Sequence, residues 1–198
     1  MKKKLLLVLV VILLLFPATI FAGDLFGLSI GASAILLEEI PLDGDIDFDP
    51  ADVGMDDFEL GGEIRFNISL LELSVLILPV DYGEYEDGYY LYATVVPMLG
   101  LSVELVDLVD LGVAVGTWGD VFVSTEGDFD TSYYDIKQQE LFLRASVDFN
   151  LGFLSVGGFA MVFPQMTVGE VLDSDFEPSA IEVPTSAYVG VSALINLL

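Results

Sequence analysis

Residues 58–70 read FELGGEIRFNISL, and apolar and polar residues alternate along this stretch almost without error. A period of two is the period of a β-strand, because successive side chains point to opposite faces of a pleated sheet. One face would carry apolar or small side chains, and the other would carry Glu59, Glu63, Arg65 and Asn67. The stretch therefore predicts a strand with one apolar face and one charged face.

The same alternation recurs along the chain. It is clearest in 25–37, 58–69, 139–150 and 185–197, and less clean where apolar residues also fall on the polar face. Pro97 interrupts one segment, and because proline cannot donate to a sheet ladder it implies a bulge or a different strand boundary there. We predict eight strands, at residues 25–37, 58–69, 71–80, 89–105, 111–123, 139–150, 152–164 and 185–197.

The connections between these strands are of two kinds. Most of the 32 acidic residues lie in four loop-like segments, 38–57, 81–88, 124–138 and 169–184. Between these segments the chain reverses tightly near residues 70–72, 107–110 and 149–152. Alternating long loops and short turns are typical of bacterial outer-membrane barrels. The predicted fold class is therefore all-β, an eight-stranded antiparallel up-and-down transmembrane β-barrel.

The N-terminus has the pattern of an export signal. Lys2 to Lys4 are followed by an apolar run from Leu5 to Phe16 and a small-residue-rich stretch ending at Ala22. Twelve helical residues rise only about 18 Å, against roughly 30 Å for a hydrocarbon core. We therefore expect a cleaved signal peptide at 1–22 and a barrel domain at 23–198, with a retained signal anchor as the alternative.

Composition excludes several functions. Removing Lys2 to Lys4 with the signal leaves three cations against 32 carboxylates, so the net charge becomes about −29. Such a chain repels phosphate backbones, which excludes nucleic acid as a partner. The chain has neither cysteine nor histidine, so thiolate chemistry and the commonest general base are absent. We expect no enzymatic activity, because no serine lies beside an obvious base either.

On these patterns the chain resembles the small eight-stranded outer-membrane barrels, such as the transmembrane part of outer-membrane protein A and the X-type and W-type proteins. The resemblance covers the whole of 23–198. It implies residence in the bacterial outer membrane, lipid contact, and insertion by the barrel assembly machinery. That machinery usually reads an outward-facing aromatic residue at the C-terminus, whereas this chain ends Ile195-Asn196-Leu197-Leu198, with Leu197 in the outward register.

The charged residues inside the predicted strands point to the lumen. An arginine facing lipid near the bilayer midplane would cost roughly 2–4 kcal/mol. We therefore expect an interior salt-bridge network, in which Glu63 and Arg144 meet across the lumen or each arginine pairs with its strand neighbours. A set of large apolar side chains also falls on or near the inner face, where it would plug the core or hold an apolar solute. The network comprises Glu63, Arg65, Glu140, Arg144 and Asp148, and the apolar set comprises Phe142, Phe159, Met161 and Phe163.

Metal binding has one weak candidate. Asp43, Asp45, Asp47 and Asp49 alternate in DGDIDFD, and hard divalent cations prefer oxygen ligands. The spacing does not fit the twelve-residue calcium loop, so a solvated charge run is the simpler interpretation. We expect no cofactor beyond weakly bound divalent cations.

Four functions remain open. The favoured one is a structural or surface-interaction anchor that displays acidic extracellular loops toward an extracellular or host ligand. A narrow W-type channel, or a carrier for small apolar solutes, is the main alternative. A lipid-modifying enzyme and a soluble secreted β-sandwich or lipocalin-like barrel are the others, and the last would need polar outer faces on its strands.

Overall fold

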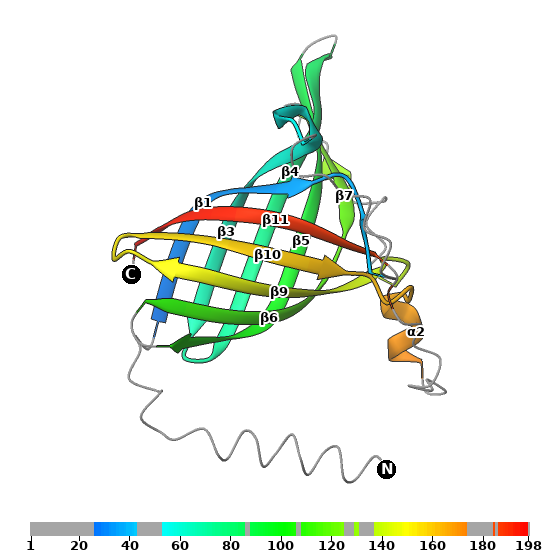
Figure 1. The fold of residues 1–198 in the computed structure, drawn as a ribbon. Coiled ribbons are helices and arrows are strands. Elements are labelled where there is room, and N and C mark those ends of the chain that lie inside the picture. Colours follow the sequence, from blue (N-terminus) through cyan, green and yellow to red (C-terminus); the bar gives the residue numbers. More distant parts are fainter. Residues whose placement is uncertain are drawn as a thin grey trace.

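The computed structural model describes residues 26–42, 53–85, 88–105, 108–124, 129–130, 137–173, 184 and 186–197. In this part of the chain an antiparallel meander closes on itself (Figure 1). The strands of the wall are, in chain order, β1 (Phe26–Leu36), β3 (Phe58–Ile68), β4 (Leu71–Tyr85), β5 (Gly88–Leu105), β6 (Val109–Thr117) with its continuation β7 (Gly119–Ser124), β9 (Leu141–Asn150), β10 (Leu154–Val162) and β11 (Ser186–Asn196).

Each strand of this wall pairs with its neighbour along the chain, and β1 pairs with β11 to close the ring. The closing register runs from Ser29 opposite Asn196 to Ile35 opposite Gly190. With β6 and β7 counted as one strand, the wall formed by the described residues has eight strands. The antiparallel eight-stranded barrel predicted from the sequence is confirmed.

Short turns gather at one end of the barrel. Residues 69–70 join β3 to β4, and residues 151–153 join β9 to β10. In the second turn Gly152 adopts a φ of 84°, which glycine reaches at little cost. The start of β1 and the end of β11 lie at this same end, since Phe26 pairs with Ile68 and the Leu197 N–H donates to the Leu28 carbonyl.

The opposite end carries the smaller elements, namely β2 (Ile40–Pro41), η2 (Met55–Asp57), β8 (Phe129–Asp130) and α2 (Val168–Leu172). Strand β2 pairs with β11, and β8 pairs with β7. No helix among the described residues has both the length and the apolar character needed to cross a membrane.

The predicted loop at 81–88 is wrong. Strand β4 continues to Tyr85 and β5 begins at Gly88, and the two remain paired to their ends. The register shifts once, between Pro79 and Asp81. Figure 1 shows the two strands rising together above the rest of the barrel. The acidic and glycine residues of this segment favour a loop in the sequence, but each residue from Asp81 to Tyr85 pairs with a residue of β5.

The bulge or strand boundary predicted at Pro97 is wrong, because β5 continues through Pro97 without either. Pro97 pairs opposite Val75 in an unbroken ladder with β4. The break occurs on the other side, where β6 ends at Thr117, β7 begins at Gly119 and Trp118 lies between them. The Pro97 carbonyl points toward β6 at Gly116, so the missing N–H is on that side too. The proline thus explains why the predicted strand 111–123 is divided.

The outer wall of the barrel is apolar all around. In β9, for example, every second side chain from Leu143 to Phe149 faces outward, and Leu143 and Phe149 are each more than half exposed. All the other strands of the main wall contribute to the same surface. Its exposed members include Phe26, Ile30, Leu60, Ile64, Leu73, Ile77, Leu99, Leu101, Leu111, Val113, Val147, Val156, Val191 and Ile195. We call this surface the apolar belt.

Candidate functional site

The interior of the barrel contains a charged layer that crosses the lumen. Strands β3 and β9 lie opposite each other in the eight-stranded ring. Glu63 of β3 accepts a hydrogen bond from Arg144 of β9, with 2.9 Å between Oε1 and Nη1. The same Glu63 oxygen accepts from Arg65 Nε at 2.7 Å, and Ser33 donates to its other oxygen. The side chain of Glu63 is fully buried.

A second ion pair crosses the lumen beside the first. Arg65 Nη1 lies 2.7 Å from Asp148 Oδ2, so Arg65 joins its strand neighbour Glu63 to the opposite wall. The Ser192 hydroxyl donates to the other Asp148 oxygen at 3.1 Å and accepts from Arg65 Nη2 at 3.2 Å. Arg65 therefore pairs both with a strand neighbour and across the lumen, whereas the salt bridge of Arg144 is the predicted one to Glu63 across the lumen.

The charged layer ends in apolar side chains on its loop side. The Arg144 guanidinium carbon lies 4.0 Å from the centre of the Phe159 ring, a cation–π contact. Beyond it the side chains of Phe142 and Met161 are fully buried. These three residues form one core cluster with Ile35, Leu76, Leu78, Val96 and Met98.

A polar layer fills the end of the lumen near the short turns. Ser29 donates to the side-chain oxygen of Asn196 at 2.9 Å, and the Asn196 side-chain nitrogen donates to the Ser155 hydroxyl at 3.0 Å. Asn150 accepts from Ser155 and donates to Asp110 at 2.7 Å. The interior is therefore filled by side chains in successive polar, charged and apolar layers, as expected for a ring of eight strands.

Two carboxylates are placed differently from the sequence analysis. Glu140, predicted to join the salt-bridge network, instead precedes β9 at the loop end, where its backbone forms an isolated β-bridge with that of Thr167. Glu72 belongs to the charged layer instead, because it is buried and its carboxylate accepts from Ser74 at 3.5 Å. Glu72 falls within the predicted strand 71–80, and its alternation with Ser74 places both side chains on the inner face.

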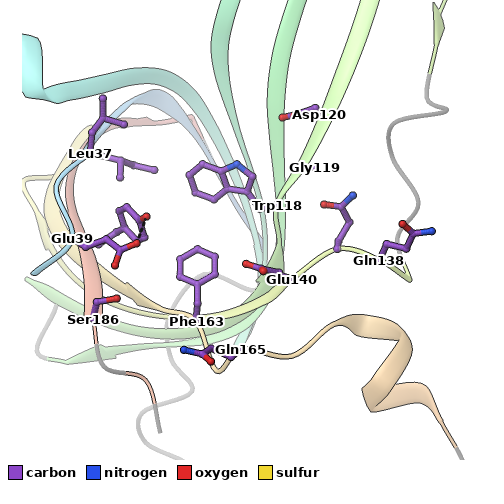
Figure 2. A pocket seen from close by; sticks show the side chains of 13 residues that line it. Leu37, Glu39, Trp118, Gly119, Asp120, Gln138, Glu140, Phe163, Gln165 and Ser186 are labelled. Atoms are coloured by element: carbon purple, nitrogen blue, oxygen red, sulfur yellow. Dashed lines mark hydrogen bonds between the residues drawn. The ribbon is translucent and has the colours of Figure 1, made fainter. Parts of the chain in front are cut away.

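The loop end of the lumen opens into a cavity of about 720 Å³, which we call the cup. Its floor is aromatic, since the Phe163 ring centre lies 6.2 Å from that of Trp118 and 5.5 Å from that of Tyr188. Figure 2 shows the Trp118 and Phe163 rings between Glu39 on one side and Glu140 on the other. The remaining lining residues are Ile35, Leu37, Gly119, Asp120, Gln138, Gln139, Gln165 and Ser186.

Carboxylates around the cup are held in place by hydroxyl groups. The Tyr188 hydroxyl donates to Glu39 at 2.7 Å, and this hydrogen bond, followed by one from Ser186, lowers the pKa of Glu39. Asp120 accepts from the Tyr92 hydroxyl at 2.6 Å and from Thr94 at 2.7 Å. These hydrogen bonds fix the two carboxylates without neutralising them.

The remaining site residues divide between the core and the cup. Phe142, Phe159 and Met161 lie in the buried cluster, whereas Phe163 forms part of the floor of the cup. Asp43, Asp45, Asp47 and Asp49 lie outside the described residues. Within the described part of the chain, no group of three or more acidic side chains is arranged to hold a metal ion.

No family model and no curated protein matches the chain. Three similar solved structures are the attachment invasion locus protein Ail of Yersinia pestis in complex with the heparin analogue sucrose octasulfate, Neisserial surface protein A, and the outer membrane protein OprG from Pseudomonas aeruginosa. Their identities to this chain are 14%, 9% and 10%, and their TM-scores are 0.40, 0.37 and 0.35. The matches cover 86%, 87% and 86% of this chain and 95%, 96% and 92% of the respective structures. At these values, function has to be argued from the chain's own geometry.

Proposed function

We propose that this protein is a non-conducting barrel of the bacterial outer membrane that anchors acidic loops at the cell surface. The observation that carries the proposal is the apolar belt. Large aliphatic and aromatic side chains are exposed around the whole wall, while the charged residues of the lumen are buried, namely Glu63, Arg65, Glu72, Arg144 and Asp148. A soluble barrel of this size would leave that surface in water, at a cost that rises with its area.

The height of the belt fits a bilayer. From Leu141 to Phe149 the outward side chains of β9 span eight residue steps, or about 27 Å along the strand. A tilt of about 40° shortens this to roughly 21 Å along the barrel axis, close to the ~25 Å apolar band of outer-membrane barrels. Lipid is thus the expected partner of the outer wall, and the barrel assembly machinery the expected route of insertion.

The filled lumen supports an anchor rather than an open pore. The ion pairs of Glu63 and Arg65 and the apolar cluster above them occupy the bore in successive layers. A solute would have to displace both layers to pass. The loops at the other end, with any extracellular or host ligand, would then carry the function.

Cell fractionation tests this proposal. We expect the protein in the outer-membrane fraction, soluble only with detergent, and with a heat-modifiable position on gels because closed barrels resist unfolding. N-terminal sequencing of the same material tests cleavage after Ala22, a position outside the described residues. A soluble periplasmic protein followed in the same preparation is the control. Recovery of the chain as a monomer from the aqueous periplasmic fraction would contradict the proposal.

A narrow channel or a carrier for small apolar solutes is the second candidate, because the aromatic floor of the cup could receive such a solute. The path below the cup is closed by Phe142 and Met161, which are both fully buried. We expect only small, rare openings in planar bilayers. A large stable conductance, or saturable uptake of a small apolar solute into liposomes, would favour this second function.

A further inference from the structure

We propose that the cup at the loop end binds a small organic cation, namely a protonated amine carried on an apolar body. Binding of this kind can be measured on the purified protein in detergent, so it succeeds or fails independently of where the protein resides. A cavity of about 720 Å³ lies within the ~300–1,000 Å³ of typical small-molecule pockets.

The floor of the cup supplies the apolar half of the site. The Phe163 ring contacts both Trp118 and Tyr188, with ring centres 6.2 and 5.5 Å apart. Phe142, 5.7 Å from Phe163, supports them from below. A ring or short alkyl chain resting on this floor would be shielded from water, and an attached ammonium group would lie near aromatic faces that attract cations.

The wall of the cup supplies the charge. Glu39 comes from the segment after β1, Asp120 from β7 and Glu140 from the residue before β9, so three separate parts of the chain bring carboxylates to one cavity. The salt bridges found among the described residues join Glu63 and Asp148 to the two arginines deep in the lumen, and none of them reaches these three carboxylates.

This combination discriminates between classes of ligand. An anion would be repelled by the carboxylates. A neutral apolar solute would gain binding energy from contact with the aromatic floor but would not interact with the charge of the carboxylates. A bare metal ion would find no group of three acidic ligands among the described residues, and aromatic rings are poor ligands for hard cations. An amine on an apolar body uses both halves of the cup.

The chain carries its own reporter, because Trp118 is its single tryptophan and lies in the floor of the cup. We would titrate the detergent-solubilised protein with 2-phenylethylammonium and follow tryptophan fluorescence. The neutral 2-phenylethanol and the anionic 3-phenylpropionate serve as matched ligands of nearly the same shape. We expect a saturable change with the amine that weakens as salt is raised, much weaker binding of the alcohol, and none of the anion.

Two variants test whether the carboxylates of the cup bind the ammonium group. Glu140→Gln and Glu39→Gln should each weaken amine binding roughly fivefold, which corresponds to about 1 kcal/mol. Glu38→Gln removes the neighbouring exposed carboxylate, which does not line the cup, and should leave the affinity unchanged. Heat-modifiable migration on gels checks that each variant is folded.

Several results would overturn the proposal. Equal affinity for the alcohol and the amine would make the cup an apolar site only. An affinity that does not change with salt would exclude the carboxylates even if a variant failed to fold. Equal effects of Glu38→Gln and Glu140→Gln on the affinity for the amine would mean that the amine binds outside the cup. The absence of any saturable fluorescence change with the amine would exclude the site.

Discussion

Glu63 is the central residue of the interior, because Ser33, Arg65 and Arg144 all donate to its carboxylate. Breaking a buried ion pair by removing one partner typically costs about 3–5 kcal/mol, since the other charge stays buried and unpaired. We expect Arg144→Met and Glu63→Gln each to cost stability of this order. The double variant should cost less than the sum of the two, because neither charge is then stranded.

Denaturant-induced unfolding in lipid vesicles measures this cycle. Pairing Arg144→Met with Asp110→Asn provides the control, because Asp110 bonds to Asn150 in the polar layer rather than to Arg144. That control pair should be additive to within about 0.5 kcal/mol. If the Glu63 pair were equally additive, the ion pair across the lumen would not operate in the folded protein.

At the residue scale the sequence predicted the charged layer through alternation alone. The even spacing of Glu63 and Arg65, and of Arg144 and Asp148, places all four on the inner face of their strands. It could not predict the location of Glu140, because a residue at a strand end belongs to the mouth as readily as to the lumen. The cup was also missed, since it is formed by Glu39, Trp118 and Phe163 from segments far apart in the chain.

At the scale of a single strand, Gly61 and Gly62 in β3 test which face is inside. A methyl group on Gly61 would lie 2.4 Å from the Ile77 carbonyl oxygen and 2.7 Å from the Leu78 side chain. A methyl group on Gly62 would meet nothing within 4 Å. We expect Gly61→Ala to cost about 1–3 kcal/mol through overcrowding, and Gly62→Ala to be neutral or slightly stabilising. Unfolding in vesicles measures both, and a reversed order would mean that the strand faces the other way.

The hairpin of β4 and β5 has two regions that should differ in stability. From Leu71 to Ile77, β4 pairs with both β3 and β5, whereas from Asp81 to Tyr85 it pairs with β5 alone. Amides of the second region should therefore exchange with deuterium faster than those of the first, because fewer of them are bonded and their contacts are fewer. Hydrogen exchange followed by mass spectrometry measures the difference. Equal protection of the two regions would contradict the one-sided pairing of β4 from Asp81 to Tyr85.

Most strands could be predicted, because a period of two is a strong signal when one face of the wall is apolar and the other, toward the lumen, is polar. The failures have local causes. The sequence predicts a loop at 81–88 because acidic residues and glycines favour turns, although a pair of strands above the barrel can carry polar residues on both faces. The division at Trp118 was missed because its cause, Pro97, lies on the neighbouring strand.

At the scale of the whole molecule, the belt and the lumen invert the usual arrangement of a soluble protein. The charges inside satisfy one another, and large apolar side chains cover the outside. The chain has a net charge of −26, and most of the carboxylates responsible for it belong to the segments between the predicted strands. The apolar belt and the acidic segments therefore require different surroundings, lipid for the first and water for the second, which is the physical basis of the proposed anchor.

A charge placed on the belt distinguishes lipid from water outside the wall. Val113 is 60% exposed at the centre of β6, next to the exposed Leu101 of β5. We expect Val113→Arg to cost about 2–4 kcal/mol in a bilayer, because the guanidinium would lie near the midplane. Tyr82→Arg is the matched control, since Tyr82 is 81% exposed on the hairpin above the barrel, where a charge should cost at most about 1 kcal/mol.

Unfolding in vesicles measures the stability of both variants. In water an exposed substitution changes stability by only about 0.5 kcal/mol. Equal small costs for the two variants would therefore mean that the belt does not face lipid, and the membrane anchor would have to be given up even though the barrel itself remained.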